Sequence, residues 1–133
     1  MTWRKAIFVD SFSHKNPIPP ACRLDNWIAT GVVSGRDARR SISPDALTQA
    51  RAMFVNLETI LAAAGASLDD ILKLNVWIAS ESVRAHLNTA WLEAFPDAQT
   101  RPARQVMIYA HLTEGQLLQC DALAIVRSNN NSS

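Results

Sequence analysis

Residues 54–79, FVNLETILAAAGASLDDILKLNVWIA, contain the change of hydrophobic period that decides the fold. Before Gly65 the apolar side chains recur at alternating spacings of three and four, which is typical of one face of an α-helix. This face begins upstream of the quoted stretch and comprises Leu47, Ala50, Phe54, Leu57, Leu61 and Ala64. After Asp70 the apolar residues alternate, which predicts a strand over residues 71–79 with Leu72, Leu74, Val76 and Ile78 on one face. The stretch therefore predicts a long helix that leads through a short turn into a strand.

The ends of this helix have recognisable capping residues. Ser43 is predicted to be the N-cap, Pro44 to occupy the first helical position, and Gly65 to end the helix. Ser67 lies three residues before Asp70, which is the spacing of a capping box. This spacing predicts a short helical turn immediately before the strand.

Toward the C-terminus the sequence predicts a second helix and two further strands. The helix is expected over residues 81–95 and ends before Pro96. Its apolar stripe consists of Leu87, Ala90, Trp91 and Ala94. The strands correspond to QVMIYAHL (105–112) and LLQCDALAIV (117–126), and TEGQ joins them.

The N-terminal part is predicted to add two strands, RKAIFV (4–9) and WIATGVVSG (27–35). Gly31 inside the second indicates a bulge or a close approach of the backbone to another group. Residues 12–26 are predicted to form a loop, because their three prolines exclude a regular helix or a central strand. The order β-β-α-β-α-β-β favours an α+β two-layer domain, with a mixed sheet and both helices on one face. We expect a single domain over residues 1–127, followed by a polar, disordered tail over 128–133.

The sheet face opposite the helices is predicted to need a cover. Val32, Trp77, Met107 and Cys120 are assigned to that face and are all apolar. Because a soluble protein rarely exposes a large apolar face, we expect this one to be buried between subunits.

Composition and charge argue against several classes of function. The chain has 133 residues and a formal net charge of +1, so no global field favours nucleic acid or an anionic membrane. It has neither an apolar run of about 20 residues, enough to span a bilayer, nor a signal-peptide pattern, so we expect a cytoplasmic protein. Cys22 and Cys120 are expected to be free thiols. His14, His86 and His111 have no ligand spacing, which argues against a metal site.

The candidate for chemistry is Arg104 in TRPARQVMIY (100–109). Alternation along a strand places Arg104, Val106 and Ile108 on one face. The residues alone leave two interpretations open: a solvated charge at a sheet edge, or a guanidinium fork that binds a carboxylate. Arg101 is expected to be a solvated surface charge. Cys22 is a possible nucleophile, although a structural thiol is the favoured interpretation.

Several stretches together carry a family resemblance. They are RPARQV (101–106), LTEGQLLQCDALAIV (112–126), NPIPPACRLDNWIATG (16–31), HLNTAWLEAFPD (86–97) and the stretch quoted first. With them the chain resembles the Rid/YjgF family of reactive intermediate deaminases, formerly called L-PSP endoribonucleases, over residues 14–126. The resemblance implies a chorismate-mutase-like α+β fold, a homotrimer and a ligand cleft between neighbouring subunits.

The resemblance also implies an activity and a set of site residues. The activity is hydrolysis of 2-imino acids or their enamine tautomers to 2-keto acids and ammonia, without a metal or organic cofactor. Arg104 matches the arginine that holds the substrate carboxylate, and main-chain groups near Gly31 and Val106 line the cleft. Asn88 matches a family asparagine, but we interpret Asn88 and Trp91 as structural.

The sequence departs from the family pattern at two places. The glutamate that positions water and transfers protons corresponds here to Gln119, whose amide is not an acid or base near neutral pH. Asp121 shares a strand face with Gln119, about 6.6 Å away along the strand, and matches a second acidic position. The aromatic residue of the early loop is not recognisable, and Cys22 lies in that region. A non-catalytic binder of small carboxylates such as 2-keto acids is therefore an alternative, whereas the net charge argues against RNA cleavage.

Overall fold

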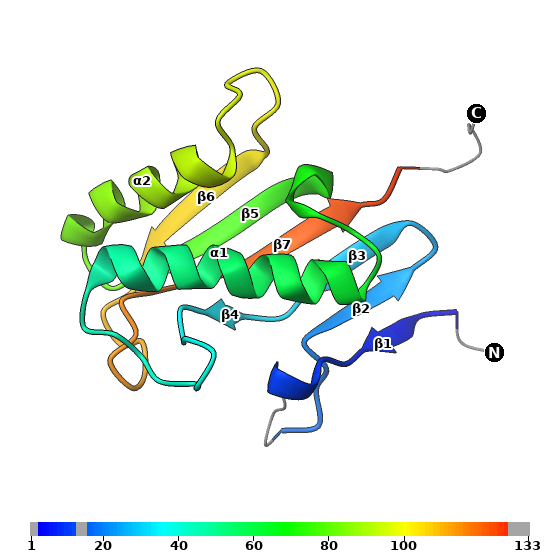
Figure 1. Ribbon diagram of the computed structural model, residues 1–133, viewed down its shortest axis with the longest axis horizontal. Coiled ribbons are helices and arrows are strands. Elements are labelled where there is room, and N and C mark those ends of the chain that lie inside the picture. Colours follow the sequence, from blue (N-terminus) through cyan, green and yellow to red (C-terminus); the bar gives the residue numbers. More distant parts are fainter. Residues whose placement is uncertain (1–2, 13–15, 128–133) are drawn as a thin grey trace.

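The computed structural model describes residues 3–12 and 16–127, so the predictions for His14 and for residues 128–133 lie outside the described residues. One sheet has the strand order β1-β2-β3-β7-β5-β6, and β4 also pairs with β7 (Figure 1). The strands are β1 (Lys5–Ile7), β2 (Ala21–Leu24), β3 (Trp27–Thr30), β4 (Val33–Ser34), β5 (Ile71–Ile78), β6 (Ala103–Ile108) and β7 (Leu118–Ile125). The helices are α1 (Ala46–Ala63) and α2 (Arg84–Ala94), with short 3-10 turns η1 (Asp10–Phe12), η2 (Leu68–Asp70) and η3 (Glu81–Val83).

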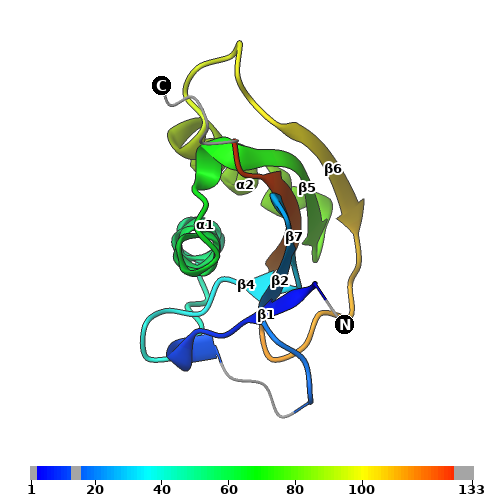
Figure 2. The ribbon, with the colours of Figure 1, turned by 90° about the vertical axis from the view of Figure 1, so that its right-hand side faces the viewer.

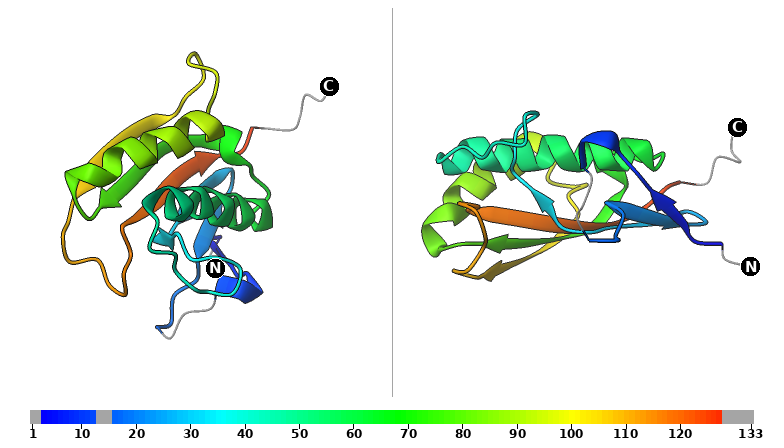
Figure 3. Two further views of the ribbon diagram at one scale, coloured as in Figure 1. Left: turned by 60° about the vertical axis from the view of Figure 1, so that its left-hand side comes forward. Right: turned by 90° about the horizontal axis from the view of Figure 1, so that it is seen from below.

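Both helices cover the same face of the sheet, as the views in Figures 2 and 3 show. Strands β5 and β6 are parallel and are connected through α2, whereas the other neighbouring pairs are antiparallel. The buried apolar side chains form one cluster between the helices and the sheet. The predicted α+β class, a mixed sheet with two helices on one face, is confirmed.

Helix α1 has the predicted apolar face but begins later than predicted. Asp45, not Ser43, is the N-cap, and its carboxylate accepts a hydrogen bond of 2.9 Å from the Thr48 main-chain N–H. The Ser43 hydroxyl instead accepts a hydrogen bond of 3.1 Å from the main-chain N–H of Asp45, which precedes the first helical residue. The Asp45 carboxylate lies closer to the first helical donors, which explains the two-residue error. Gly65 ends the helix as predicted, with a positive φ of 87°.

Strand β5 contains an irregularity that the alternating pattern hides. The register shifts between Ile71 and Lys73, so Leu72 has no partner on β7. A bulge of this kind resets the alternation, because two residues then face one on the neighbouring strand. Ile71 is therefore buried and Leu72 is 51% exposed, whereas Leu74 and the later inward residues follow the prediction. Assigning Leu72 to the buried face was wrong.

The N-terminal part contains a strand that the prediction missed. Strand β2 begins at Ala21, directly after the last proline of the predicted loop, and pairs with β1 and β3. The predicted strand over 27–35 is divided into β3 and β4 around Gly31. Three residues, 30–32, lie opposite two, 121–122, which is the bulge that Gly31 predicted. The Thr30 hydroxyl accepts from the Ala122 N–H at 2.9 Å and so replaces a main-chain partner there.

The sheet face away from the helices carries Trp77 and Met107 side by side, as predicted. Val32 is half exposed in the bulge. Cys120 was assigned to this face wrongly: it is fully buried on the helix side, in the inward series of Leu118, Ala122 and Ala124. Burial raises the pKa of the Cys120 thiol, and the neighbouring Asp121 charge raises it further. Both cysteines are free, as predicted.

Replacing Gly35 by alanine is expected to destabilise the protein by about 2 kcal/mol, because overpacking a close contact typically costs about 1–3 kcal/mol. A Cβ at Gly35 would lie 2.8 Å from the main-chain carbonyl carbon of Gln49 in α1, too close for either backbone to stay in place. Gly31→Ala is the matched control, since its Cβ would lie 3.6 Å from the Pro20 oxygen. Urea denaturation measures both variants; equal stabilities would contradict the predicted clash.

Candidate active site

Arg104 lies beneath α2, on the helix side of the sheet. Parallel pairing aligns Arg104 with Leu74, Val106 with Val76 and Ile108 with Ile78. Partners in such a pair point to the same face, so the three β6 side chains share a face as predicted. The Arg104 guanidinium carbon lies 4.9 Å from the centroid of the Trp91 ring, which is within the range of a cation–π contact.

Among the residues that the structure describes, none accepts a hydrogen bond from the Arg104 guanidinium. Its Nη1 atom is buried and makes no hydrogen bond to the described residues. Burial lowers the pKa of Arg104 below its usual value, and the charge of Arg84 lowers it further. Arginine nevertheless stays protonated in proteins, so the site keeps its positive charge. A buried donor without an acceptor costs roughly 1–3 kcal/mol, and an anionic ligand would remove that cost.

Arg101 is a structural residue rather than the solvated charge that was expected. Its Nε donates to the Phe95 carbonyl at 2.8 Å, and its Nη2 to the Pro96 carbonyl at 3.3 Å. These carbonyls lie just beyond the C-terminus of α2, where cations and donors stabilise a helix. Arg101 therefore ties the start of β6 to the end of the helix that covers Arg104.

Gln119 and Asp121 lie on the opposite face of the sheet. They alternate with the buried residues of β7 and pair with Trp77 and Asn75 respectively. One Asp121 carboxylate oxygen accepts a hydrogen bond of 2.9 Å from the Asn75 amide. Asp121 thus has a structural partner, whereas Gln119 keeps its amide directed to the uncovered face.

The structure does not bring Arg104 and Gln119 together within one chain. Their strands are separated by β5, and neighbouring strands lie about 4.8 Å apart. The two side chains also point to opposite faces. A site that uses both residues needs them from two different subunits.

The other predicted site residues also form two groups, one near Arg104 and one on the far side of β7. Val106 follows Arg104 on β6, and Asn88 is half-buried on α2 one turn before Trp91. Gly31 and Cys22 lie on the other side of β7 in the strand order. Gly31 is exposed, and its N–H donates to the Pro20 carbonyl at 2.8 Å. Cys22 is half-buried on β2 between Ala6 and Ala29, not in a loop.

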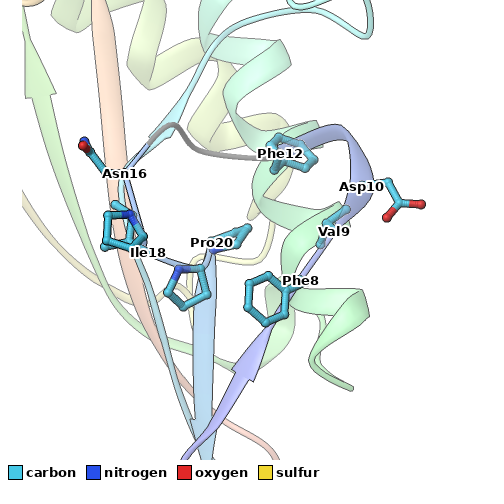
Figure 4. Close-up of a pocket in the computed structure, with 9 residues that line it drawn as sticks. Phe8, Val9, Asp10, Phe12, Asn16, Ile18 and Pro20 are labelled. Atoms are coloured by element: carbon cyan, nitrogen blue, oxygen red, sulfur yellow. The ribbon is translucent and has the colours of Figure 1, made fainter.

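A cleft of about 530 Å³ lies between the chain after β1 and the proline-rich segment (Figure 4). It adjoins Gly31 through Pro20, at the opposite end of the strand order from Arg104 on β6. Its lining consists of Phe8, Val9, Asp10, Phe12, Asn16, Pro17, Ile18, Pro19 and Pro20. None of these carries a positive charge, and Asp10 is an acid. The cleft is therefore unsuited to a carboxylate, and Arg104 remains the better candidate for anion binding.

Trp91 makes one contact that the sequence interpretation did not include, with the Arg104 guanidinium. It was assigned to the apolar stripe of α2 and interpreted as structural, and it is buried there. The contact with Arg104 depends on the distance between α2 and β6 and on the side-chain rotamers, which no periodicity contains. The sequence does contain one indication of this contact: a cation, Arg104, and an aromatic residue, Trp91, lie on elements that follow one another in the predicted order.

The part of the chain that the structure describes contains no cluster of three or more histidine, cysteine or acidic side chains able to hold a metal ion. No helix among residues 3–12 and 16–127 is long and apolar enough to cross a membrane.

The fold, with a half-buried arginine beneath α2, is that of an α+β protein of the Rid type. Residues 12–126 match the family described as Endoribonuclease L-PSP, so the chain belongs to this family, the Rid/YjgF family. The Escherichia coli YjgF gene product has the same fold, with a TM-score of 0.85 and 25% identity over 92% of this chain and 99% of that chain. RidA from a Psychrobacter species has a TM-score of 0.83 at 24% identity, again over 92% and 99% of the two chains.

Two relatives are similar over a shorter stretch. The Escherichia coli protein named "Putative reactive intermediate deaminase TdcF" is 33% identical over 85 residues, 63% of this chain and 66% of TdcF. A RutC family protein of Pyrococcus horikoshii is 30% identical over 83 residues, 62% of this chain and 64% of the relative. The chain therefore aligns with slightly less than two thirds of the length of each.

Proposed function

We propose that the protein hydrolyses 2-imino acids, or their enamine tautomers, to 2-keto acids and ammonia. The observation that carries this proposal is Arg104, a half-buried cation with a buried donor that no residue in the described chain uses. A guanidinium fork in this state matches a carboxylate better than it matches a neutral or cationic ligand. The name of TdcF, a relative, agrees with this choice of substrate class.

The chemistry requires little from the protein beyond orientation. Water adds to the electrophilic imine carbon, and the resulting carbinolamine expels ammonia, so one water is consumed for each ammonia released. Arg104 fixes the adjacent carboxylate and thereby directs the imine carbon toward the attacking water. The Gln119 amide of a neighbouring subunit can hold that water by hydrogen bonds, but it cannot take up or release a proton near neutral pH. No step requires a metal or an organic cofactor.

We propose that the working unit is a homotrimer with the site between subunits. One half of the site, with Arg104, Val106 and Asn88, lies on β6 and α2, and β6 is an edge strand. The other half, with Gly31 and Gln119, lies beyond β5 in the same chain. Association of copies through the uncovered sheet face would bury its apolar residues, Trp77 and Met107 among them.

The deaminase proposal is tested by generating 2-iminopropionate from alanine with an amino acid oxidase and trapping the remaining imine with semicarbazide. Wild-type protein is expected to lower the trapped imine well below the level left by spontaneous hydrolysis. A wild-type rate equal to the protein-free rate, across imines of several amino acids, would overturn the proposal. Sedimentation velocity measures the assembly, and a monomer at assay concentration would contradict the intersubunit site.

A second candidate function, a non-catalytic binder of 2-keto acids, is favoured by the amide at position 119. In that case 2-oxobutyrate is expected to raise the Tm of wild-type protein by several degrees, because a ligand that binds only the folded state stabilises it. The same compound has no effect on Arg104→Met, and no imine is consumed. Thermal denaturation with a panel of carboxylates measures this. If the whole panel leaves Tm unchanged, the binder proposal is wrong.

A further inference from the structure

Trp91 connects Arg104 to the aromatic packing between the two helices. The face of the Trp91 ring lies beneath the Arg104 guanidinium, and the guanidinium carbon is 4.9 Å from the ring centroid. Phe95 packs against Trp91 with 4.7 Å between ring centroids, and Phe54 of α1 contacts Phe95 edge-on at 6.0 Å. Trp91 is only 9% exposed, so this aromatic series runs from α1 to Arg104 within the core.

Arg104, like Arg40 over the Phe12 ring, lies against an aromatic ring and is held differently from Arg51 and Arg84. Arg51 and Arg84 each form two hydrogen bonds to a carboxylate, of Glu93 and Glu81 respectively. A carboxylate anchor of that kind neutralises the cation and occupies its donors. Within residues 3–12 and 16–127 the Arg104 side chain forms no hydrogen bond or ion pair, and its contact is an aromatic face.

An aromatic face can hold a guanidinium and still leave its N–H donors and its charge free to bind a ligand. The attraction acts on the face of the planar cation, whereas the N–H donors lie in its plane. The ring also offsets part of the burial cost and the repulsion from Arg84, which together lower the pKa of Arg104. The result is a positioned cation whose charge and donors both remain available.

From this geometry we infer that Trp91 is a positioning residue, which holds the Arg104 guanidinium in its carboxylate-binding orientation by a cation–π contact. The inference rests on the proposed function for its kinetic consequence, but the contact itself can be tested without any substrate. Removing the ring leaves the guanidinium free to rotate, so a ligand must then order it on binding.

The substrate-free test uses nitrogen-15 NMR of the arginine side chains. The Arg104 Nε–H signal is assigned by its loss in Arg104→Lys, and the indole ring is expected to shift it upfield. Trp91→Leu abolishes this shift and Trp91→Phe reduces it. Phe95→Leu is the matched control, because it weakens the same aromatic series without touching Arg104, and it leaves the shift in place. An unchanged shift in Trp91→Leu, or equal changes in Trp91→Leu and Phe95→Leu, would overturn the inference.

The kinetic test separates positioning from general loss of stability. Trp91→Leu is expected to raise KM for 2-imino acids about tenfold, with kcat changed by less than about twofold, since the cation–π contact orders a binding group. Trp91→Phe restores most of the affinity, and Phe95→Leu lowers Tm without changing KM. A KM that follows Tm across all three variants would show a merely structural role. If wild-type protein has no deaminase activity and binds no 2-keto acid, the proposed function fails, and the NMR result still decides the role of Trp91.

Discussion

Replacing Arg104 by methionine is expected to lower kcat/KM for 2-imino acids at least about 100-fold, because two charge-assisted hydrogen bonds to the carboxylate contribute about 3 kcal/mol or more. Most of this loss is expected in KM, since the carboxylate is bound equally in the ground state and the transition state. The free protein is expected to be as stable as wild type or more stable. Methionine removes a desolvated cation with an unpaired buried donor and keeps apolar contact with the Trp91 ring.

Two further variants give this prediction its controls. Arg104→Lys keeps the charge but loses the planar fork, so an intermediate activity is expected. Arg51→Met removes an exposed arginine paired with Glu93 on the surface between the helices, and it changes the net charge by the same amount. Imine hydrolysis and urea denaturation are measured for all three. If Arg51→Met loses as much activity as Arg104→Met, the carboxylate role of Arg104 is refuted.

The elements of this fold that the sequence predicts well are those with a long, unbroken period. The α1 stripe from Ala50 to Ala64 and the second half of β5 are buried as predicted, because each side chain repeats the same relation to one packing surface. Errors occur where one residue breaks the period. The bulge at Leu72 exposes that side chain. In β7 the pairing with β5 decides which alternate residues face the helices, and it places Cys120 on the buried side.

The candidate site is less accessible to sequence reasoning, because its residues are far apart along the chain and lie on different faces. Alternation correctly groups Arg104 with Val106 and Gln119 with Asp121. It cannot show that these two pairs point to opposite sides of the sheet, since that depends on how β6, β5 and β7 are ordered and registered. The contact of Trp91 with Arg104, the Asn75 partner of Asp121 and the attachment of Arg101 to the end of α2 likewise follow from tertiary packing.

Replacing Gln119 by glutamate is expected to raise kcat for imine hydrolysis at least about tenfold, because a positioned general acid–base typically contributes 10²–10⁴-fold. The substitution is isosteric, and Gln119 is half-buried at the uncovered sheet face, so folding should be unaffected. The gain should depend on pH in a defined direction. Asp121, on the same face two residues away, disfavours a second negative charge and raises the pKa of the introduced carboxylate. The added activity is therefore lost as pH falls through that raised pKa.

Gln99→Glu is the matched control, since it adds the same charge in an exposed loop between α2 and β6. Rates measured from pH 4 to pH 9 should show the new acidic limb in Gln119→Glu and in neither Gln99→Glu nor wild type. If the two halves of the site belong to different subunits, as proposed, the double variant Arg104→Met with Gln119→Glu should lose the gain. A mixture of this double variant with wild type should regain part of it after subunit exchange, because hybrid assemblies pair the wild-type Arg104 with the introduced glutamate. Arg104, which binds the carboxylate, and the introduced general base would then act across an interface. No gain in Gln119→Glu would contradict the proposed role of position 119 in proton transfer.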